Sequence, residues 1–73
     1  MSAMQTFIDN VERIRKERGL TQVQLAERMG TKQPSVSRVL RGEEEITLRR
    51  AEIFASALGV SLADLVLEPE FAK

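Results

Sequence analysis

Apolar residues recur at steps of three and four along most of the chain, which is the spacing of one face of an α-helix. This spacing predicts five helices, at about 6–18, 22–29, 32–41, 48–58 and 62–68. No segment alternates apolar and polar residues in the manner of a half-buried strand, and no linker is long enough to divide the chain. The pattern therefore predicts an all-α fold, a compact five-helix domain that covers residues 1–73.

The predicted helix ends near the middle of the chain carry residues that favour them. Thr21 opens the second helix with the sequence pattern of a capping box, and Gly30 ends this helix. The third helix tolerates Pro34 because the amides of a first turn have no intrahelical acceptor, and it ends at Gly42. Two helices joined by a short turn at Gly30 form a helix-turn-helix over residues 21–42.

The composition narrows the classes of function. The 73 residues contain neither Cys nor His, which excludes disulfides and effectively excludes a structural zinc site, so no metal or cofactor is expected. Because Tyr is also missing, general acid–base or nucleophilic chemistry would fall to Lys, Ser and carboxylates, in a chain with little room for a water-excluding pocket. We therefore expect neither an enzyme nor a small-molecule site.

The apolar runs are too short to span a membrane, and no signal-peptide pattern opens the chain. The expectation is a soluble, cytoplasmic protein. Its small core must be stabilised by helix packing, and self-association would add to that.

The charge of the chain is unevenly distributed. Eleven basic and eleven acidic side chains give a formal net charge of zero, which at first argues against a nucleic-acid partner. However, residues 1–12 carry −2, residues 13–42 carry +6 and residues 43–73 carry −4. This distribution permits one positive face on a neutral protein.

The positive segment contains the outer face of the third predicted helix. That face has no acidic group and comprises Lys32, Gln33, Ser35, Ser37, Arg38 and Arg41. In the major groove of DNA, Gln can bond adenine and Arg or Lys can bond guanine. The start of the second helix, with Gln22 and free backbone amides, suits a phosphate. The pattern therefore indicates binding to double-stranded DNA.

Two stretches of the chain resemble one family. Residues 20–42, LTQVQLAERMGTKQPSVSRVLRG, and residues 51–65, AEIFASALGVSLADL, are similar to the Cro/lambdoid-repressor-type helix-turn-helix proteins, also called the XRE family. The resemblance implies a lambda-repressor-like domain that binds a palindromic operator as a homodimer. It also implies a repressor, activator or autoregulator, and it leaves the operator sequence and the sign of regulation open.

The resemblance also implies roles for individual residues. Base edges, or phosphates beside them, should be contacted by Lys32, Gln33, Ser35, Ser37 and Arg38. Phosphates should be contacted by Thr21, Gln22 and Arg41. The alternative for each residue is ordinary solvated surface, and Arg41 could instead complement the dipole of its own helix.

The chain departs from the family pattern at two places. Many members have Glu where this chain has Leu40, paired with an Arg at the position of Arg15, so Arg15 needs another partner: Glu12 or the acidic run 43–45. The family often carries Lys, Arg or Asn after the third helix, where the carboxylates of this run would be repelled by a DNA backbone, so the loop should turn away or weaken binding. We prefer a role before the fourth helix, with Glu45 and Arg49 as an i,i+4 pair.

The segment from Gly42 to Thr47, with an apolar residue at position 40, is also similar to HigA-like antitoxins. An antitoxin, or another protein-interaction module whose partner is a toxin or other protein, is therefore the alternative function. Its contact surface would be the acidic segment 43–73.

The last predicted helix has more apolar side chains than one short helix can bury inward. We therefore predict a dimer interface in segment 60–71, made by Leu62, Leu65, Val66 and Phe71. The alternative is that Phe71 folds back onto the first helix.

Overall fold

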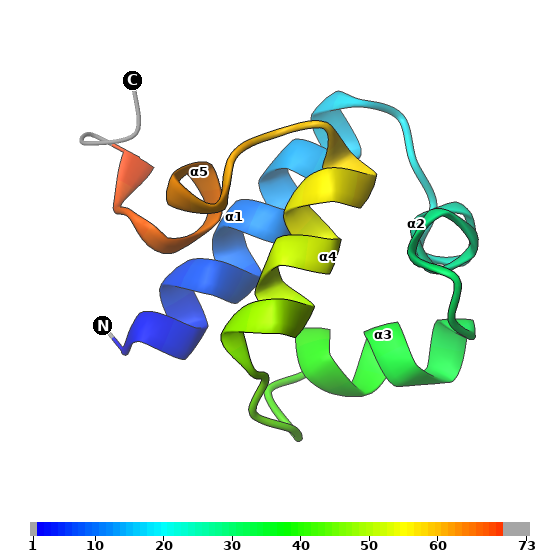
Figure 1. The fold of residues 1–73 in the computed structure, drawn as a ribbon, viewed down its shortest axis with the longest axis horizontal. Helices are drawn as coiled ribbons and strands as arrows, with labels where there is room; N and C mark the ends of the chain where they lie inside the picture. Colours follow the sequence, from blue (N-terminus) through cyan, green and yellow to red (C-terminus); the bar gives the residue numbers. More distant parts are fainter. Residues whose placement is uncertain (1, 70–73) are drawn as a thin grey trace.

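The computed structural model describes residues 2–69, and every structural statement below concerns these residues. They form five helices: α1 (Ala3–Glu17), α2 (Gln22–Met29), α3 (Gln33–Leu40), α4 (Leu48–Leu58) and α5 (Leu62–Val66) (Figure 1). The prediction of an all-α, five-helix domain is confirmed. Helix α1 begins earlier than predicted, because the hydroxyl of Ser2 caps it by accepting a hydrogen bond from the amide of Gln5 at 3.0 Å.

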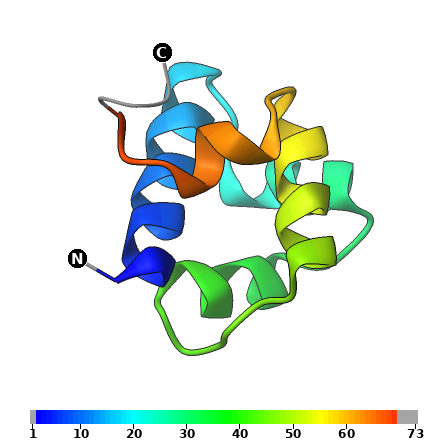
Figure 2. The ribbon, with the colours of Figure 1, turned by 60° about the vertical axis from the view of Figure 1, so that its left-hand side comes forward.

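The core lies between α1 and α4 and is closed by the other helices. Helix α5 packs against α1 and α4, and α2 and α3 cover the other end of the domain (Figures 1 and 2). Phe54 on α4 is fully buried and meets Phe7 on α1 edge to face, with ring centroids 5.3 Å apart. None of the helices in the described residues combines the length and apolar character needed to cross a membrane.

Helices α2 and α3 form the predicted helix-turn-helix. Thr21 and Gln24 make the expected capping box at the start of α2. Gly30 ends α2 with φ at 74°, a left-handed conformation that glycine adopts without strain. Ala26 and Val36 are almost completely buried, so the two helices approach closely and their angle is fixed by packing.

The chain reverses direction after α3. Gly42 has φ at 76°, and the amide of Glu43 donates to the carbonyl of Arg38 at 3.0 Å. Ile46 then packs against the core, and the hydroxyl of Thr47 caps α4 by accepting a hydrogen bond from the amide of Arg50 at 3.1 Å. The reversal brings the start of the acidic run back beside the end of α3.

Helix α5 is short and is anchored at both ends. Ser61 and Asp64 form a capping box at its start. At its end, the side-chain amide of the buried Asn10 donates to the carbonyls of Leu65 and Leu67 at 3.0 and 2.9 Å. These bonds join the last turn of α5 to the middle of α1.

One of the predicted dimer residues belongs to the core. Leu65 is 0% exposed because α5 directs it between α1 and α4, so its assignment to an exposed dimer surface was wrong. Val66, in contrast, is 43% exposed, and Leu62 is partly buried against the core. Phe71 lies outside the described residues, so both expectations for it stay predictions.

Candidate nucleic-acid interface

Helix α3 exposes one continuous stripe of side chains. Pro34, Arg38 and Arg41 are exposed and stand at i, i+4 and i+7, which places them on one side of the helix. Val36 and Val39, on the other side, are completely buried. The stripe therefore faces solvent along the whole length of α3.

The other predicted base-contact residues border this stripe. Lys32 is exposed at the N-cap position and makes no side-chain cap hydrogen bond. Gln33, Ser35 and Ser37 are each partly exposed. The structure thus brings all five residues to the exposed side of α3 or to its edges.

The start of α2 offers donors to solvent. The hydroxyl oxygen of Thr21 accepts from the amide of Gln24 at 3.0 Å, and the side chain of Gln24 accepts from the amide of Thr21 at 2.9 Å. The amides of Gln22 and Val23, at the first two helical positions, have no acceptor within the helix. They carry the positive end of the helix dipole and suit an anion.

A hydrogen-bond network connects α3, α2 and α1. The side-chain amide of Gln33 donates to that of Gln22 at 3.0 Å, and Gln22 donates to Glu12 at 3.4 Å. Glu12 also accepts from Nε of Arg15 at 2.6 Å, and Arg15 donates to the carbonyl of Leu20 at 2.7 Å. Of the two partners expected for Arg15, the structure selects Glu12. The network fixes the first residues of α2 and α3 relative to each other.

The acidic run lies beside the arginines of α3. Oε2 of Glu44 is 2.8 Å from Nε of Arg38, and Oε1 of the same carboxylate is 3.8 Å from a terminal nitrogen of Arg50 on α4. Glu43 accepts from both Nε and Nη2 of Arg41, at 3.0 and 3.3 Å. The loop therefore does not turn away from α3, because the reversal at Gly42 folds it back; the alternative that the run weakens DNA binding stays a prediction.

The expected pair between Glu45 and Arg49 is not among the ion pairs of residues 2–69. Glu44 pairs with Arg50 instead. The hydrogen bond from Arg38, and then the charges of Arg38 and Arg50, lower the pKa of the Glu44 carboxyl. Glu44 is therefore an anion at neutral pH, and its contact with Arg38 is an ion pair.

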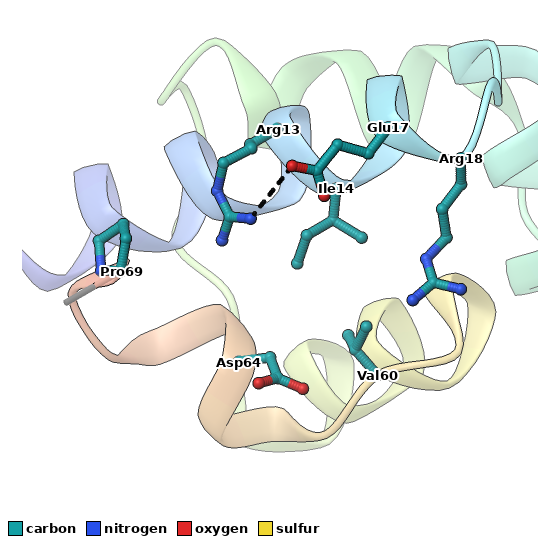
Figure 3. A pocket seen from close by; sticks show the side chains of 7 residues that line it. All are labelled: Arg13, Ile14, Glu17, Arg18, Val60, Asp64 and Pro69. Atoms are coloured by element: carbon teal, nitrogen blue, oxygen red, sulfur yellow. Dashed lines mark ion pairs between the residues drawn. The ribbon is translucent and has the colours of Figure 1, made fainter. Parts of the chain in front are cut away.

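The surface on the α1–α5 side has a different character. An open cavity of about 360 Å³ is lined by Arg13, Ile14, Glu17, Arg18, Val60, Asp64 and Pro69 (Figure 3). The positive charges of its two arginines and the negative charges of its two carboxylates largely cancel, and Arg13 pairs with Glu17 at 3.6 Å. Within the described part of the chain, no group of three or more acidic residues is placed to hold a metal ion.

Comparison with known families agrees with this geometry. A family described as "Helix-turn-helix" matches residues 11–65, more than half of the chain. The chain belongs to the Cro-type helix-turn-helix family. This is a family of DNA-binding transcriptional regulators and not of enzymes, as the sequence predicted.

Two solved structures are similar to this helix-turn-helix protein. The hypothetical transcription factor NHTF from Neisseria is 32% identical with a TM-score of 0.89, over 94% of this chain and 79% of that chain. The restriction-modification controller protein C.AhdI from Aeromonas hydrophila is 27% identical with a TM-score of 0.79, over 85% of this chain and 94% of that chain. A comparison with curated protein sequences gives no match.

Sequence reasoning missed two features of this helix-turn-helix surface. The bond between Gln33 and Gln22 joins two residues that were each predicted to contact DNA, but their mutual contact was not foreseen. The pair of Arg38 with Glu44 was also missed. Its signal was the glycine at position 42, since a left-handed residue after a helix returns the chain toward the last turn.

Proposed function

We propose that this protein is a sequence-specific transcriptional regulator that binds a palindromic operator as a homodimer, with α3 of each protomer in the major groove. The observation that carries the proposal is the exposed stripe of Pro34, Arg38 and Arg41 beside the open amides of α2. A helix-turn-helix docks by placing one helix in the major groove of DNA and the start of its other helix against the DNA backbone.

Gln33 retains the groups needed to recognise adenine. A side-chain amide has two N–H groups and one oxygen, and Gln22 takes only one N–H of Gln33. The remaining N–H and the oxygen match N7 and the N6 amino group of adenine. Gln22 therefore orients Gln33 and leaves it one donor and one acceptor for a base.

Phosphate contacts would surround these base contacts. The hydroxyl of Thr21 accepts from Gln24, which leaves its own proton free to be donated to a phosphate. The amides of Gln22 and Val23 add two more donors at the start of α2. Arg41, near the C-terminal end of α3, reaches the backbone once it leaves Glu43.

The proposed dimer surface lies around the end of α5. Val66 and Leu67 are 43% and 42% exposed, and Leu48 is 73% exposed. Val66 and Leu48 line the same small apolar hollow, so they are neighbours on one surface. Together with Leu62 they form an apolar patch that a second copy would cover around a two-fold axis. A dimer would space two α3 helices for half-sites about 34 Å apart.

The regulator would act in the cytoplasm by occupying its operator, and it needs no cofactor for that. Selection of binding sites from random double-stranded DNA, followed by titration of the selected site and of an unrelated duplex at one salt concentration, tests the proposal. Preference for a palindromic site supports it. Equal affinity for the two duplexes would overturn it.

The alternative is an antitoxin or another protein-interaction module. The observation that favours it is the acidic run, because Glu43 and Glu44 offset two of the positive charges of α3. A toxin-like reading frame next to this one, together with failure to bind its own promoter at low salt, would favour the alternative. An autoregulator, in contrast, would bind that promoter.

A further inference from the structure

Glu44 accepts a hydrogen bond from only one of the three guanidinium nitrogens of Arg38. The hydrogen bond between them uses only Nε of Arg38, at 2.8 Å. Within residues 2–69, the two terminal nitrogens of Arg38 donate no hydrogen bond. Arg41 differs, because Glu43 accepts hydrogen bonds from both its Nε and its Nη2. Both terminal nitrogens of Arg38 are therefore free of hydrogen bonds to residues 2–69, whereas one terminal nitrogen of Arg41 is bound to Glu43.

Glu44 is itself held from two sides. One carboxylate oxygen contacts Arg38 on α3 and the other lies 3.8 Å from Arg50 on α4. Arg50 is only 32% exposed at its side chain, so this support comes from a group that rests on the domain surface. The carboxylate thus bridges two helices and provides a fixed support for the Nε side of Arg38.

We propose that Glu44 is a positioning residue for DNA recognition, which fixes Arg38 so that its two terminal nitrogens can pair with O6 and N7 of a guanine. The inference rests on the proposed function. Arginine recognises guanine with two parallel donors, and this needs a defined orientation of the guanidinium plane. A free arginine side chain loses conformational freedom when it is fixed on a base, and a side chain already held by Glu44 loses less.

The competing role for Glu44 is simple repulsion of DNA. A carboxylate near the backbone lowers the affinity for every sequence by a similar factor. A positioning residue acts on one base pair, so its loss changes the ratio of affinities between the cognate site and a site substituted at that guanine. This ratio of affinities separates the two roles, because repulsion changes both affinities by the same factor and leaves their ratio unchanged.

The test uses the full chain with Glu44→Ala, Glu44→Gln and the matched control Glu43→Ala, each titrated with the selected operator and with the operator substituted at the guanine contacted by Arg38. The ratio should fall at least about threefold in Glu44→Ala, which is part of the discrimination that one bidentate pair gives against the wrong base. Glu44→Gln keeps an acceptor for Nε and should retain most of the ratio. Glu43→Ala should tighten binding to both duplexes equally.

A second measurement needs no DNA. The Nε–H signal of Arg38 in the NMR spectrum of the free protein should be protected from exchange in the wild type and in Glu44→Gln, and not in Glu44→Ala. The thermal midpoint should move by at most a few degrees, because an exposed ion pair contributes little to stability.

An unchanged ratio in Glu44→Ala, or an Arg38 signal equally protected in the wild type and in Glu44→Ala, would overturn the positioning role while the proposed function stands. A wild-type chain that binds all sequences equally would overturn the proposed function itself. The two failures are therefore distinguishable.

Discussion

The side-chain amide nitrogen of Gln33 lies 3.0 Å from the side-chain oxygen of Gln22, which joins the first residue of α3 to the first residue of α2. The residue proposed to contact a base is thus oriented by a residue proposed to lie at the backbone. The proposed base contact and the proposed phosphate contact would therefore be coupled through this hydrogen bond.

Gln22→Ala should therefore weaken discrimination at the base pair contacted by Gln33, as well as overall affinity. We expect a loss of about 1–3 kcal/mol at the cognate site, because Gln33 loses the partner that orients it. Titration of the cognate site and of a site substituted at that base pair measures both effects. The matched control is Gln24→Ala, which removes one arm of the capping box but no bond to Gln33. Equal losses of discrimination in the two variants would contradict the coupling.

Arg41→Ala should reduce affinity for all sequences alike. Arg41 is proposed to contact phosphate, and the loss of one phosphate contact should lower the slope of log affinity against log salt by about 1. Titrations of one duplex at several salt concentrations give the slope. Lys16→Ala is the control, since this exposed residue on α1 has no proposed contact with DNA. A slope unchanged in Arg41→Ala would remove Arg41 from the phosphate contacts.

Val66→Glu should disrupt the dimer and leave the fold intact, because Val66 is half exposed on the proposed dimer surface. Light scattering after size exclusion should give a dimer for the wild type and a monomer for the variant. Leu65→Ala, one position away, should instead destabilise the protomer by about 2–5 kcal/mol, since Leu65 is fully buried. A dimer that survives Val66→Glu would place the interface elsewhere.

Asn10→Ala should destabilise the domain without any change on the α3 surface. The buried amide of Asn10 satisfies two carbonyls at the end of α5, and their loss should cost about 1–3 kcal/mol. Urea unfolding monitored by circular dichroism measures the change. Asp9→Ala, at an exposed neighbouring position, should change stability by less than about 0.5 kcal/mol. Equal stability of the two variants would show that the bonds of Asn10 are replaced by water.

The features of this fold that depend on neighbouring residues were predictable from the sequence. The capping box of Thr21, the left-handed Gly30 and the cap at Thr47 follow from local hydrogen-bonding rules. The long apolar periods of α1 and α4 identified their buried faces. The start of α1 was missed because Ser2 acts as a cap in a segment with little apolar periodicity.

The remaining features depend on how separate segments meet. Helix α5 has little more than one turn, so its sequence pattern could not separate the buried Leu65 from the exposed Val66. The contact between Arg38 and Glu44 spans six positions across a chain reversal, beyond the reach of helical spacing. Arg15, in contrast, found its partner Glu12 within one turn of α1, where spacing is informative.

Helix α3 is proposed to recognise DNA sequence through its exposed stripe, and Arg38 stands in the middle of that stripe. The most direct measurement compares wild type with Arg38→Ala on the selected operator and on an unrelated duplex at fixed salt. The variant should lose about 1–3 kcal/mol on the operator and much less on the unrelated duplex. Superimposable operator-binding curves for the two proteins would contradict the claim.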